Sequence, residues 1–479
     1  MALESMRELD PQYRPSNRTI LLFLSVFAAA LVFYAVFWPT APAQAPDSNT
    51  YMSFAREIAQ GRVAHLQMRT PGYPLFLLLT RSEVTPQRLL FYTQLALHFA
   101  SISFLAYVLW FLRVKAWAIA AFTGVALLPP YVEPSAYVLS ETLTTFCVVA
   151  DFAALIFWLH TRKTALLALF TAAAVSAPFV RPTYELLVPL TGSCAAVAML
   201  LGCLPRLNFR RLILPMALSL ALAMGCLGAY SFWNYKRFHY FGTSYLSALA
   251  LSIKTVTVIE FLPPEYAGLK EILLRHRDKY MLQPGTDHMA LDYIHRAYPD
   301  VLQYYGGDEV KALNELRRMN AALIEAKPMS YLIESSKLFW LYWLPDERPL
   351  SAGQSGIRRA MGAALQMAVI GIFFLQEIML CGVTIFWLSL RLFGKGAAWS
   401  PPEGAGLACA AWLIGSGIIF YNCVVACAFG SGIPRYRSTS DLLIMAVSAV
   451  GYTLWMRAVR RIGAGRSDSL RDSEAALPC

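Results

Sequence analysis

The chain has 479 residues; 57% of them are hydrophobic, only 15% are charged, and the mean hydropathy is +0.47. Soluble globular domains carry about a quarter charged residues, so this composition excludes an ordinary soluble protein and is typical of a membrane protein. The net charge of +11 does not indicate nucleic-acid binding, because the chain has no basic repeat and most of the excess lies in short loops between apolar runs.

Ten apolar runs along the chain have roughly the length that a transmembrane helix needs, which is about 20 residues. The third and fifth runs are short, and the eighth is long enough to tilt. The runs lie at about 19–38, 88–111, 116–130, 137–160, 164–180, 184–204, 211–232, 362–391, 404–427 and 440–457. They predict an all-α polytopic membrane protein with about ten transmembrane helices.

Lysine and arginine residues fall into alternate segments between these runs. The basic segments are the N-terminal tail, the loops at 113–115, 162–163, 206–211 and 391–395, and the C-terminal tail. Because cytoplasmic loops are enriched in Lys and Arg, both termini are expected in the cytoplasm. The opposite side would hold a first outer loop at about 39–87, a large polar segment at about 233–360 and three short loops.

The first outer loop opens with Asp47 and an amphipathic stretch in which apolar residues recur at helical spacing. Asp47 and Ser48 suit the start of this helix, and Gly61 suits its end. A helix of this kind lies along the membrane surface, which would hold the Asp47 carboxylate near the level of lipid phosphates. The simpler alternative is that Asp47 only caps the helix.

The same loop continues with Arg69-Thr70-Pro71-Gly72-Tyr73-Pro74, followed by a short apolar run. Two prolines around a Gly-Tyr pair predict a turn. Because the run is too short to cross a membrane, we expect it to dip in or to pack against neighbouring helices. Arg69 would then lie at the interface, either in a site or as an anchor to lipid headgroups.

Three more groups of polar residues lie beside the membrane on this same side: Ser140-Glu141, Arg181-Pro182 and Arg435-Tyr436-Arg437. Ionisable residues away from the positive-inside face are unfavourable unless they have a role. Glu141 could also match the dipole of the helix that it begins, and the arginines could be interface anchors. We expect Asp47, Glu141 and the arginines to gather in one pocket at the outer face of the membrane.

Four sequence stretches together resemble one known family. They are RTPGYPLFLLL in the first loop, PYVEPSAYVLSETL, APFVRPTYELLVPL and IPRYRSTSDLLI. With an aspartate after the first span, this ordered set is similar to the GT-C membrane glycosyltransferases. The nearest branch is the bacterial one related to protein O-mannosyltransferases and to lipid A aminoarabinose and galacturonic acid transferases. The resemblance covers most of the membrane part. It implies the GT-C architecture, with juxtamembrane helices in the first outer loop and a mostly helical periplasmic segment.

The resemblance implies an inverting glycosyltransferase that moves a sugar from a polyprenyl-phosphate donor to a hydroxyl group of a lipid, glycan or protein acceptor. Asp47 would be the catalytic base, and arginine forks would bind the donor phosphate. The arginines available for this role are Arg69, Arg181, Arg435 and Arg437. One or two of them could instead hold Glu141 or cap a helix C-terminus. The expected partners are the lipid-linked donor, membrane lipids and the acceptor, with no nucleic acid.

Substrate orientation is expected from Tyr51, Tyr73, Glu141, Tyr436 and His65, although a single histidine is more often an ordinary surface residue. No cofactor is certain from the resemblance. Many relatives have a second acidic residue directly after the loop aspartate, where this chain has Ser48. This difference weakens a paired-carboxylate metal site, and a divalent metal ion held by Asp47 and Glu141 is left open.

We expect three parts in the chain. Residues 1–232 would form an N-terminal GT-C transmembrane module whose first outer loop, 39–87, is catalytic. Residues 233–360 would form a periplasmic or interfacial helical segment over the site, and residues 361–479 the C-terminal transmembrane helices and a cytoplasmic tail. The resemblance implies a place in the bacterial inner (cytoplasmic) membrane, with the active site facing the periplasm.

Two other functions are compatible with the sequence: a ligase or polymerase of lipid-linked glycans, and a secondary transporter or flippase. Transporters commonly carry paired repeats and charges at mid-membrane depth. Here Asp151 is the main acid inside an apolar run, while the other charges gather at one interface. Surface chemistry is therefore favoured over passage across the membrane.

Overall fold

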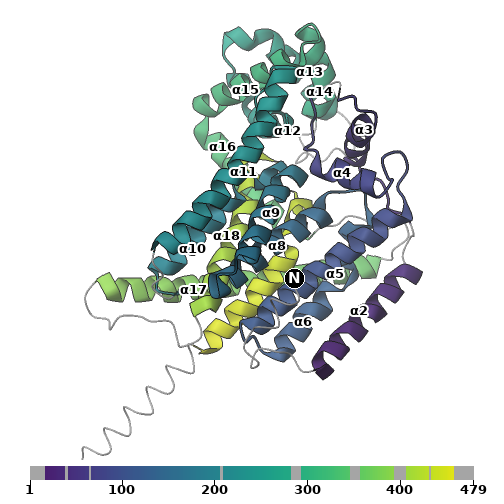
Figure 1. Ribbon diagram of the computed structural model, residues 1–479. Helices are drawn as coiled ribbons and strands as arrows, with labels where there is room; N and C mark the ends of the chain where they lie inside the picture. Colours follow the sequence, from purple (N-terminus) through teal and green to yellow (C-terminus); the bar gives the residue numbers. More distant parts are fainter. Residues whose placement is uncertain are drawn as a thin grey trace, which may run out of the picture.

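A computed structural model describes residues 17–37, 41–63, 66–204, 209–281, 293–345, 356–392, 406–430 and 433–457. Across these ranges the chain is almost entirely helical, and its one β-bridge pairs Ala43 with Tyr137. Figure 1 shows long helices that run side by side at an incline, with a group of shorter helices at one end. The predicted all-α class is confirmed.

Helices form at all ten predicted apolar runs. They are α2 (Asn17–Phe37), α5 (Arg88–Phe111), α6 (Ala116–Ala126) with α7 (Pro129–Val132), α8 (Glu141–Thr161), α9 (Thr164–Val180), α10 (Leu187–Leu200), α11 (Phe209–Phe238), α17 (Gly356–Leu392), α18 (Gly406–Phe429) and a last helix at 441–457. Among the described residues, six helices are long and apolar enough to cross a membrane, or seven if the pair bent by 66° after α6 is one span. Ten transmembrane helices therefore stay a prediction.

Prolines account for the bend in the third run. Pro129 and Pro130 follow Leu128, whose backbone is extended, with ψ of 150°. A residue before proline is disfavoured in the helical region, so α6 ends before this point and the chain restarts in another direction.

The core of the bundle lies around α8. Of its most apolar window 89% is buried inside the protein, against 17% for α11. Because α8 packs against α5, α9 and α18, its first residue, Glu141, is placed at the centre of the bundle end rather than at its rim. By contrast, α11 and α17 present apolar side chains outward, as helices that face lipid do.

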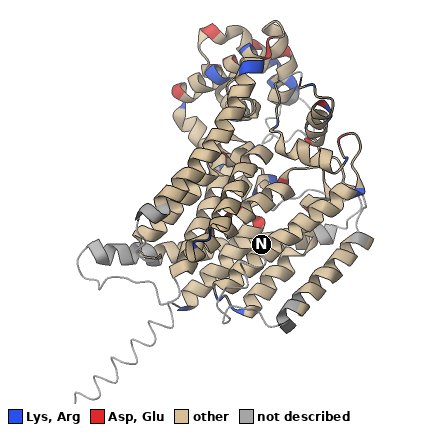
Figure 2. Ribbon diagram, viewed as in Figure 1, with Lys and Arg blue, Asp and Glu red and all other residues tan. Residues whose placement is uncertain are grey.

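The segment between α11 and α17 folds into short helices with a small core of their own. They are α12 (Leu246–Thr255), η4 (Val256–Phe261), η5 (Pro264–Tyr266), α13 (Ala267–Met281), α14 (Tyr293–Tyr304), α15 (Glu309–Ala326) and α16 (Pro328–Tyr342). Figure 2 shows many of the charged residues in this group and few along the long helices. The segment is thus polar outside and apolar inside.

Helix α16 differs from the rest of this segment. The Tyr331 hydroxyl donates to the Ala428 carbonyl near the end of α18, and the Trp343 ring lies 6.4 Å from that of Phe420. Eight residues separate Phe420 and Ala428, which corresponds to about 12 Å along a helix. Within the segment that the sequence predicted to be periplasmic or interfacial, α16 therefore runs along the side of α18.

Two helices form in the first loop, where the sequence predicted juxtamembrane helices. Helix α3 spans Ser48–Ala59 and α4 spans Gly72–Leu79, and the two pack against each other. Gly61 follows the end of α3 with a φ of +64°, a left-handed conformation that glycine adopts without steric penalty. Three short turns lie at the same end of the bundle: η2 (Glu133–Ala136), η3 (Pro182–Tyr184) and η6 (Pro434–Thr439).

Candidate active site

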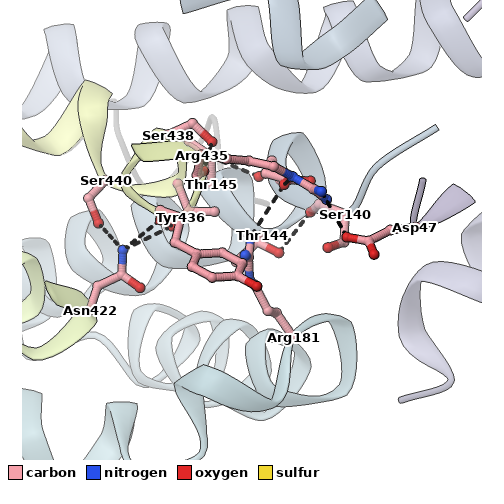
Figure 3. Close-up of polar contacts among 12 residues, drawn as sticks. Asp47, Ser140, Thr144, Thr145, Arg181, Asn422, Arg435, Tyr436, Ser438 and Ser440 are labelled. Carbon is pink, nitrogen blue, oxygen red and sulfur yellow. Dashed lines mark hydrogen bonds and ion pairs between the residues drawn. The ribbon is translucent and has the colours of Figure 1, made fainter. Parts of the chain in front are cut away.

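Five segments that are far apart in the sequence bring charged side chains to one place. They are the start of α3, the turn before α4, the start of α8, the end of α9 and η6. The side chains that meet there are Asp47, Arg69, Glu141, Arg181 and Arg435. Figure 3 shows Asp47, Arg181 and Arg435 converging beside Ser140, with Tyr436 next to Arg181.

The Asp47 carboxylate is bound by two arginines. Its Oδ1 lies 2.8 Å from Nη2 of Arg69, and its Oδ2 lies 2.8 Å from Nη1 of Arg435. Asp47 holds the N-cap position of α3, but its side chain accepts no capping hydrogen bond. The simple capping role is therefore wrong. The side chain is 31% exposed, against 13% for each of the two arginines, so it forms the open edge of the cluster.

The start of α3 is fixed by bonds to the segment before α8. The Ser48 hydroxyl donates to the Val138 carbonyl over 2.9 Å, and the Tyr51 hydroxyl lies 3.0 Å from that of Ser140. The bridge between Ala43 and Tyr137 adds a backbone connection. These contacts hold Asp47 beside the start of α8.

Arg69 is oriented by its neighbours in the first loop. Its Nε donates to Thr50 Oγ1 over 3.1 Å, and its guanidinium lies over the Tyr51 ring at 4.7 Å. Tyr51 in turn packs edge-on against Tyr73, which is fully buried and donates to Gln94. The predicted residues Tyr51 and Tyr73 therefore support Arg69, with Tyr73 in the layer behind it.

Glu141 is the buried anchor of the arginines. It is the first residue of α8, where the helix dipole favours a negative charge. Its Oε1 accepts from Nε of Arg435 over 2.5 Å and lies 3.7 Å from Nη1 of Arg181. Because its side chain is only 1% exposed, these guanidinium groups balance a charge that would otherwise be unfavourable to bury.

Arg181 lies where α9 stops. Its backbone is extended, with φ of −147°, because Pro182 follows and disfavours the helical region. Its guanidinium lies over the ring of Tyr436 at 4.7 Å. Nη1 is buried and has no hydrogen-bond partner within the described part of the chain. Arg181 thus has a nitrogen that takes part in the ion pair with Glu141 but donates no hydrogen bond within the described part of the chain.

The cluster has more positive than negative charge. Three guanidinium groups, from Arg69, Arg181 and Arg435, face two carboxylates, from Asp47 and Glu141, which leaves one positive charge in excess. The arginine side chains are only 10–13% exposed, so water screens this excess poorly. Such a site favours an anion with planar or tetrahedral oxygens, which arginine forks bind in pairs.

Electrostatics keep the groups of the cluster charged. Burial acts to raise the pKa of Asp47, but the charges of Arg69 and then Arg435 outweigh it and hold that pKa below its usual value. Burial acts to lower the pKa of Arg435, and the charges of Glu141 and Asp47 outweigh it, so that pKa is raised. Asp47 is therefore a carboxylate at neutral pH.

Arg437 points away from this cluster. It is 1% exposed, and its Nη1 donates to the carbonyls of Tyr342 and Leu344 over 3.0 and 2.5 Å. Its Nε lies 2.9 Å from Oδ1 of Asp441. Arg437 thus satisfies carbonyl groups at the C-terminal end of α16, one of the alternatives that the sequence left open. The remaining candidate, His65, lies outside the described residues.

The residues at the site do not fit a divalent metal ion. The guanidinium of Arg435 lies between the two candidate ligands, with contacts of 2.8 Å to Asp47 and 2.5 Å to Glu141. A metal ion bound by both carboxylates would have to take this position. Within the described ranges, no three His, Cys, Asp or Glu side chains come close enough to form a metal site.

Sequence reasoning missed the side chain that holds η6. The Asn422 amide is buried in α18 and donates to the Tyr342 hydroxyl, to the Tyr436 carbonyl and to Ser440 Oγ over 2.9–3.0 Å. Figure 3 shows its contacts to Tyr436 and Ser440. An asparagine inside an apolar span is itself a signal, because such polar residues usually have a partner in the bundle.

Comparison with known proteins gives similar folds among the solved structures. No family model matches the chain, and no curated protein sequence matches it significantly. An archaeal oligosaccharyltransferase, AglB from Archaeoglobus fulgidus, was solved in complex with an inhibitory peptide and a dolichol-phosphate. It matches at a TM-score of 0.47 and 11% identity, over 95% of this chain and 52% of that one. ArnT from Cupriavidus metallidurans, bound to undecaprenyl phosphate, matches at a TM-score of 0.36 and 10% identity, over 92% of this chain and 79% of that one.

The chain thus spans about half the length of the archaeal oligosaccharyltransferase. Similarity at this level concerns the arrangement of the helices and does not establish a reaction.

Proposed function

We propose that this protein is an inverting glycosyltransferase that moves a sugar from a polyprenyl phosphate to a hydroxyl group of a lipid, glycan or protein. The observation that carries the proposal is the cluster at the end of the bundle. There, one partly exposed carboxylate is held by arginines, and the cluster has one positive charge in excess. This set contains the two groups that the reaction needs, a base and a binding site for the leaving phosphate.

The arginines would bind the donor phosphate and stabilise it as it leaves. Arg181 supports this role, because its buried Nη1 lacks a hydrogen-bond partner among the described residues. Arg69 and Arg435 present terminal nitrogens to the same place through their contacts with Asp47. Fixed cationic donors in a weakly solvated site stabilise a developing negative charge more than water does. We assign no phosphate contact to Arg437, which has other partners.

Asp47 would act as the general base. The acceptor oxygen attacks the anomeric carbon of the sugar while Asp47 takes the hydroxyl proton, and the bond from that carbon to the phosphate oxygen breaks. A single displacement of this kind inverts the anomeric configuration, and polyprenyl phosphate is released. General-base assistance typically accelerates such a step by about 10²–10⁴-fold. The exposed edge that Asp47 forms is where an acceptor could approach.

Glu141 and two tyrosines would position these groups. Glu141 forms ion pairs with Arg435 and Arg181. The rings of Tyr51 and Tyr436 support the guanidinium groups of Arg69 and Arg181, respectively, through cation–π contacts. Rigid support of this kind keeps reacting groups aligned, which contributes more to rate than the strength of any one contact.

The outer segment would cover the site and recognise the acceptor. Three contacts support this assignment. Arg237 donates to the Val63 carbonyl in the first loop over 2.9 Å, Thr243 donates to Glu185 just after η3, and Lys254 donates to the Cys427 carbonyl. The first contact ties the segment to the loop that follows Asp47, the second ties it to the chain just after Arg181, and the third ties it to α18. We further propose both termini in the cytoplasm of a bacterium and the site on the periplasmic face of the inner membrane.

The test is reconstitution of the full-length protein in liposomes with radiolabelled polyprenyl-phosphate sugars and bacterial envelope lipids. We expect label in an acceptor, and its loss by at least about 100-fold in Asp47→Asn. The control is Asp300→Asn, which removes one exposed carboxylate of α14 whose contact is with His276 and not with the arginine cluster. Mass spectrometry of envelope glycans from a strain lacking the protein would name the sugar and the acceptor.

Other outcomes would point to the competing functions. Movement of label across the vesicle without a new covalent product would identify a transporter or flippase. Transfer of a whole preformed glycan, with no transfer of a single sugar, would identify a ligase or polymerase. Full activity in Asp47→Asn would remove the base from the proposed mechanism.

A further inference from the structure

Both carboxylate oxygens of Asp47 contact arginine guanidinium groups, as the oxygens of a bound phosphate would. Each accepts from the terminal nitrogen of a different guanidinium at 2.8 Å, Oδ1 from Arg69 and Oδ2 from Arg435. A phosphate group bound by two arginine forks makes the same kind of charge-assisted contacts. We infer that Asp47 and the donor phosphate compete for Arg69 and Arg435, so that donor binding releases the base for the reaction. This inference rests on the proposed function.

Arg69 and Arg435 each have one contact to the protein that can stay in place while their contact to Asp47 is replaced. In Arg69, Nε donates to Thr50 while Nη2 contacts Asp47. In Arg435, Nε donates to Glu141 while Nη1 contacts Asp47. The inner edge of each guanidinium is thus anchored to the protein. The terminal nitrogens can pass from the carboxylate to a phosphate without movement of the arginine stems.

The geometry also gives the order of the exchange. Nη1 of Arg181 is buried, makes no hydrogen bond among the described side chains and lies 3.7 Å from Glu141, so a phosphate that has displaced Asp47 can bind Nη1 without breaking a hydrogen bond. Asp47 is the most exposed member of the cluster and can turn toward the open side when it is displaced. The donor phosphate therefore takes over Arg69 and Arg435 at the open edge and then reaches Arg181.

The summed charge of Asp47 and the phosphate stays the same through the reaction. The exchange of arginine contacts from Asp47 to the phosphate is therefore favourable in a poorly solvated site. Before transfer, Asp47 carries −1 and the sugar-linked phosphodiester carries −1. Afterwards Asp47 holds the acceptor proton and is neutral, while the released phosphate monoester carries close to −2 at neutral pH. The arginines that leave Asp47 thus meet the new charge on the phosphate. While the arginines grip Asp47 they also hold its pKa down, so the base becomes stronger only once the donor has replaced it.

A binding measurement tests the competition. Farnesyl phosphate, a short polyprenyl phosphate, is titrated into the full-length protein in detergent micelles, with farnesol as the uncharged control. Asp47→Asn should bind farnesyl phosphate about tenfold more tightly than the wild type, because the competing carboxylate charge is gone. The matched control Asp300→Asn removes the same charge from α14 and should leave the Kd unchanged. The variant is thus expected to bind the phosphate better while it is inactive.

A second measurement on the wild type does not depend on how the variant folds. Carbodiimide labelling followed by mass spectrometry reports the reactivity of individual carboxyl groups. Labelling of Asp47 should rise when farnesyl phosphate is bound, relative to farnesol, because the carboxyl is released from the arginines. Labelling that stays constant or falls would overturn the inference.

The outcomes separate this inference from the proposed function. If Asp47→Asn is folded and inactive but binds farnesyl phosphate with the wild-type Kd or more weakly, the competition is wrong and the transferase stands. If the wild type binds farnesyl phosphate no better than farnesol, the phosphate site itself is wrong, and the proposed function falls with it.

Discussion

Gly72 lies directly against the backbone of Phe179: a Cβ atom on Gly72 would be 2.6 Å from the Phe179 carbonyl oxygen. Real Cβ atoms do not approach a backbone oxygen so closely, so only glycine fits here. The contact joins the first turn of α4 to the last turn of α9. Arg69 lies three residues before Gly72, and Arg181 lies two residues after Phe179, so this contact sets the spacing between the two arginines.

Gly72→Ala is therefore expected to lower the transfer rate by about tenfold or more, because a displacement of about 1 Å is enough for such losses. Overpacking should also destabilise the protein by about 1–3 kcal/mol. Initial rates and thermal unfolding in detergent measure both effects. Gly124→Ala is the matched control: it lies inside α6 with no atom within 4 Å of its added Cβ, so its rate and stability should not fall. A wild-type rate in Gly72→Ala would show that the α4–α9 contact does not position the arginines.

Glu141 should be more important for folding than for proton transfer. Glu141→Leu leaves Arg435 and Arg181 without their buried anchor, and loss of one partner from a buried ion pair destabilises proteins by about 3–5 kcal/mol. Glu141→Gln keeps an oxygen that can accept from Arg435, so it should unfold nearer to the wild type. Chemical denaturation of the two variants measures the difference, and equal stability would contradict the anchoring role.

Arg435 and Arg437 form a second matched pair, because they lie two residues apart and differ in their partners. Arg435→Lys keeps a positive charge but cannot reach Asp47 and Glu141 at once, so we expect a large loss of activity with little change in stability. Arg437→Lys leaves carbonyls of α16 or Asp441 without a donor, so we expect a lower melting temperature first. Activity of Arg437→Lys at a temperature where it is folded should remain near the wild type. The reverse pattern would move the phosphate site to Arg437.

The helices could be predicted because their signal is local. An apolar run of about 20 residues predicts a helix wherever it packs, and α5 and α9 begin and end at the predicted residues. The position of the bend was predicted less well. The third predicted run continues through Pro129 and Pro130, whereas the structure bends there. The course of α16 along α18 depends on tertiary contacts, such as that of Tyr331 with Ala428, that no local pattern reveals.

The site was predictable in composition but not in detail. The sequence predicted one pocket because five charged residues lie on the same predicted membrane face. In the structure these residues are in contact: Asp47, Arg69, Glu141, Arg181 and Arg435. Arg437, which the sequence grouped with them, has other partners for a simple reason. The segment that carries Arg435 and Arg437 is a 3-10 turn with about three residues per turn, so side chains two residues apart point in different directions. Asp47 and Arg435 lie near opposite ends of the chain, so no local sequence pattern could predict their contact.

The pH dependence of stability tests the ion pairs of Asp47. Its pKa in the folded protein is lowered, with burial opposed and outweighed by Arg69 and Arg435. In the unfolded chain an aspartate has a pKa of about 3.9. A depressed folded pKa contributes stability that is present above the unfolded value and is lost as the pH falls through the folded value. The difference in melting temperature between the wild type and Asp47→Asn should thus be constant from about pH 8 to pH 5 and shrink below about pH 4.

The ionisation of Asp47 also predicts how the activity depends on pH. Because Asp47 is already ionised in the free protein, kcat/KM should show no acid limb from this group above about pH 5. A difference in melting temperature that already shrinks between about pH 7 and pH 5 would require a raised pKa for Asp47. In that case the two arginines do not grip the carboxylate in the absence of substrate, and the competition between base and phosphate loses its physical basis.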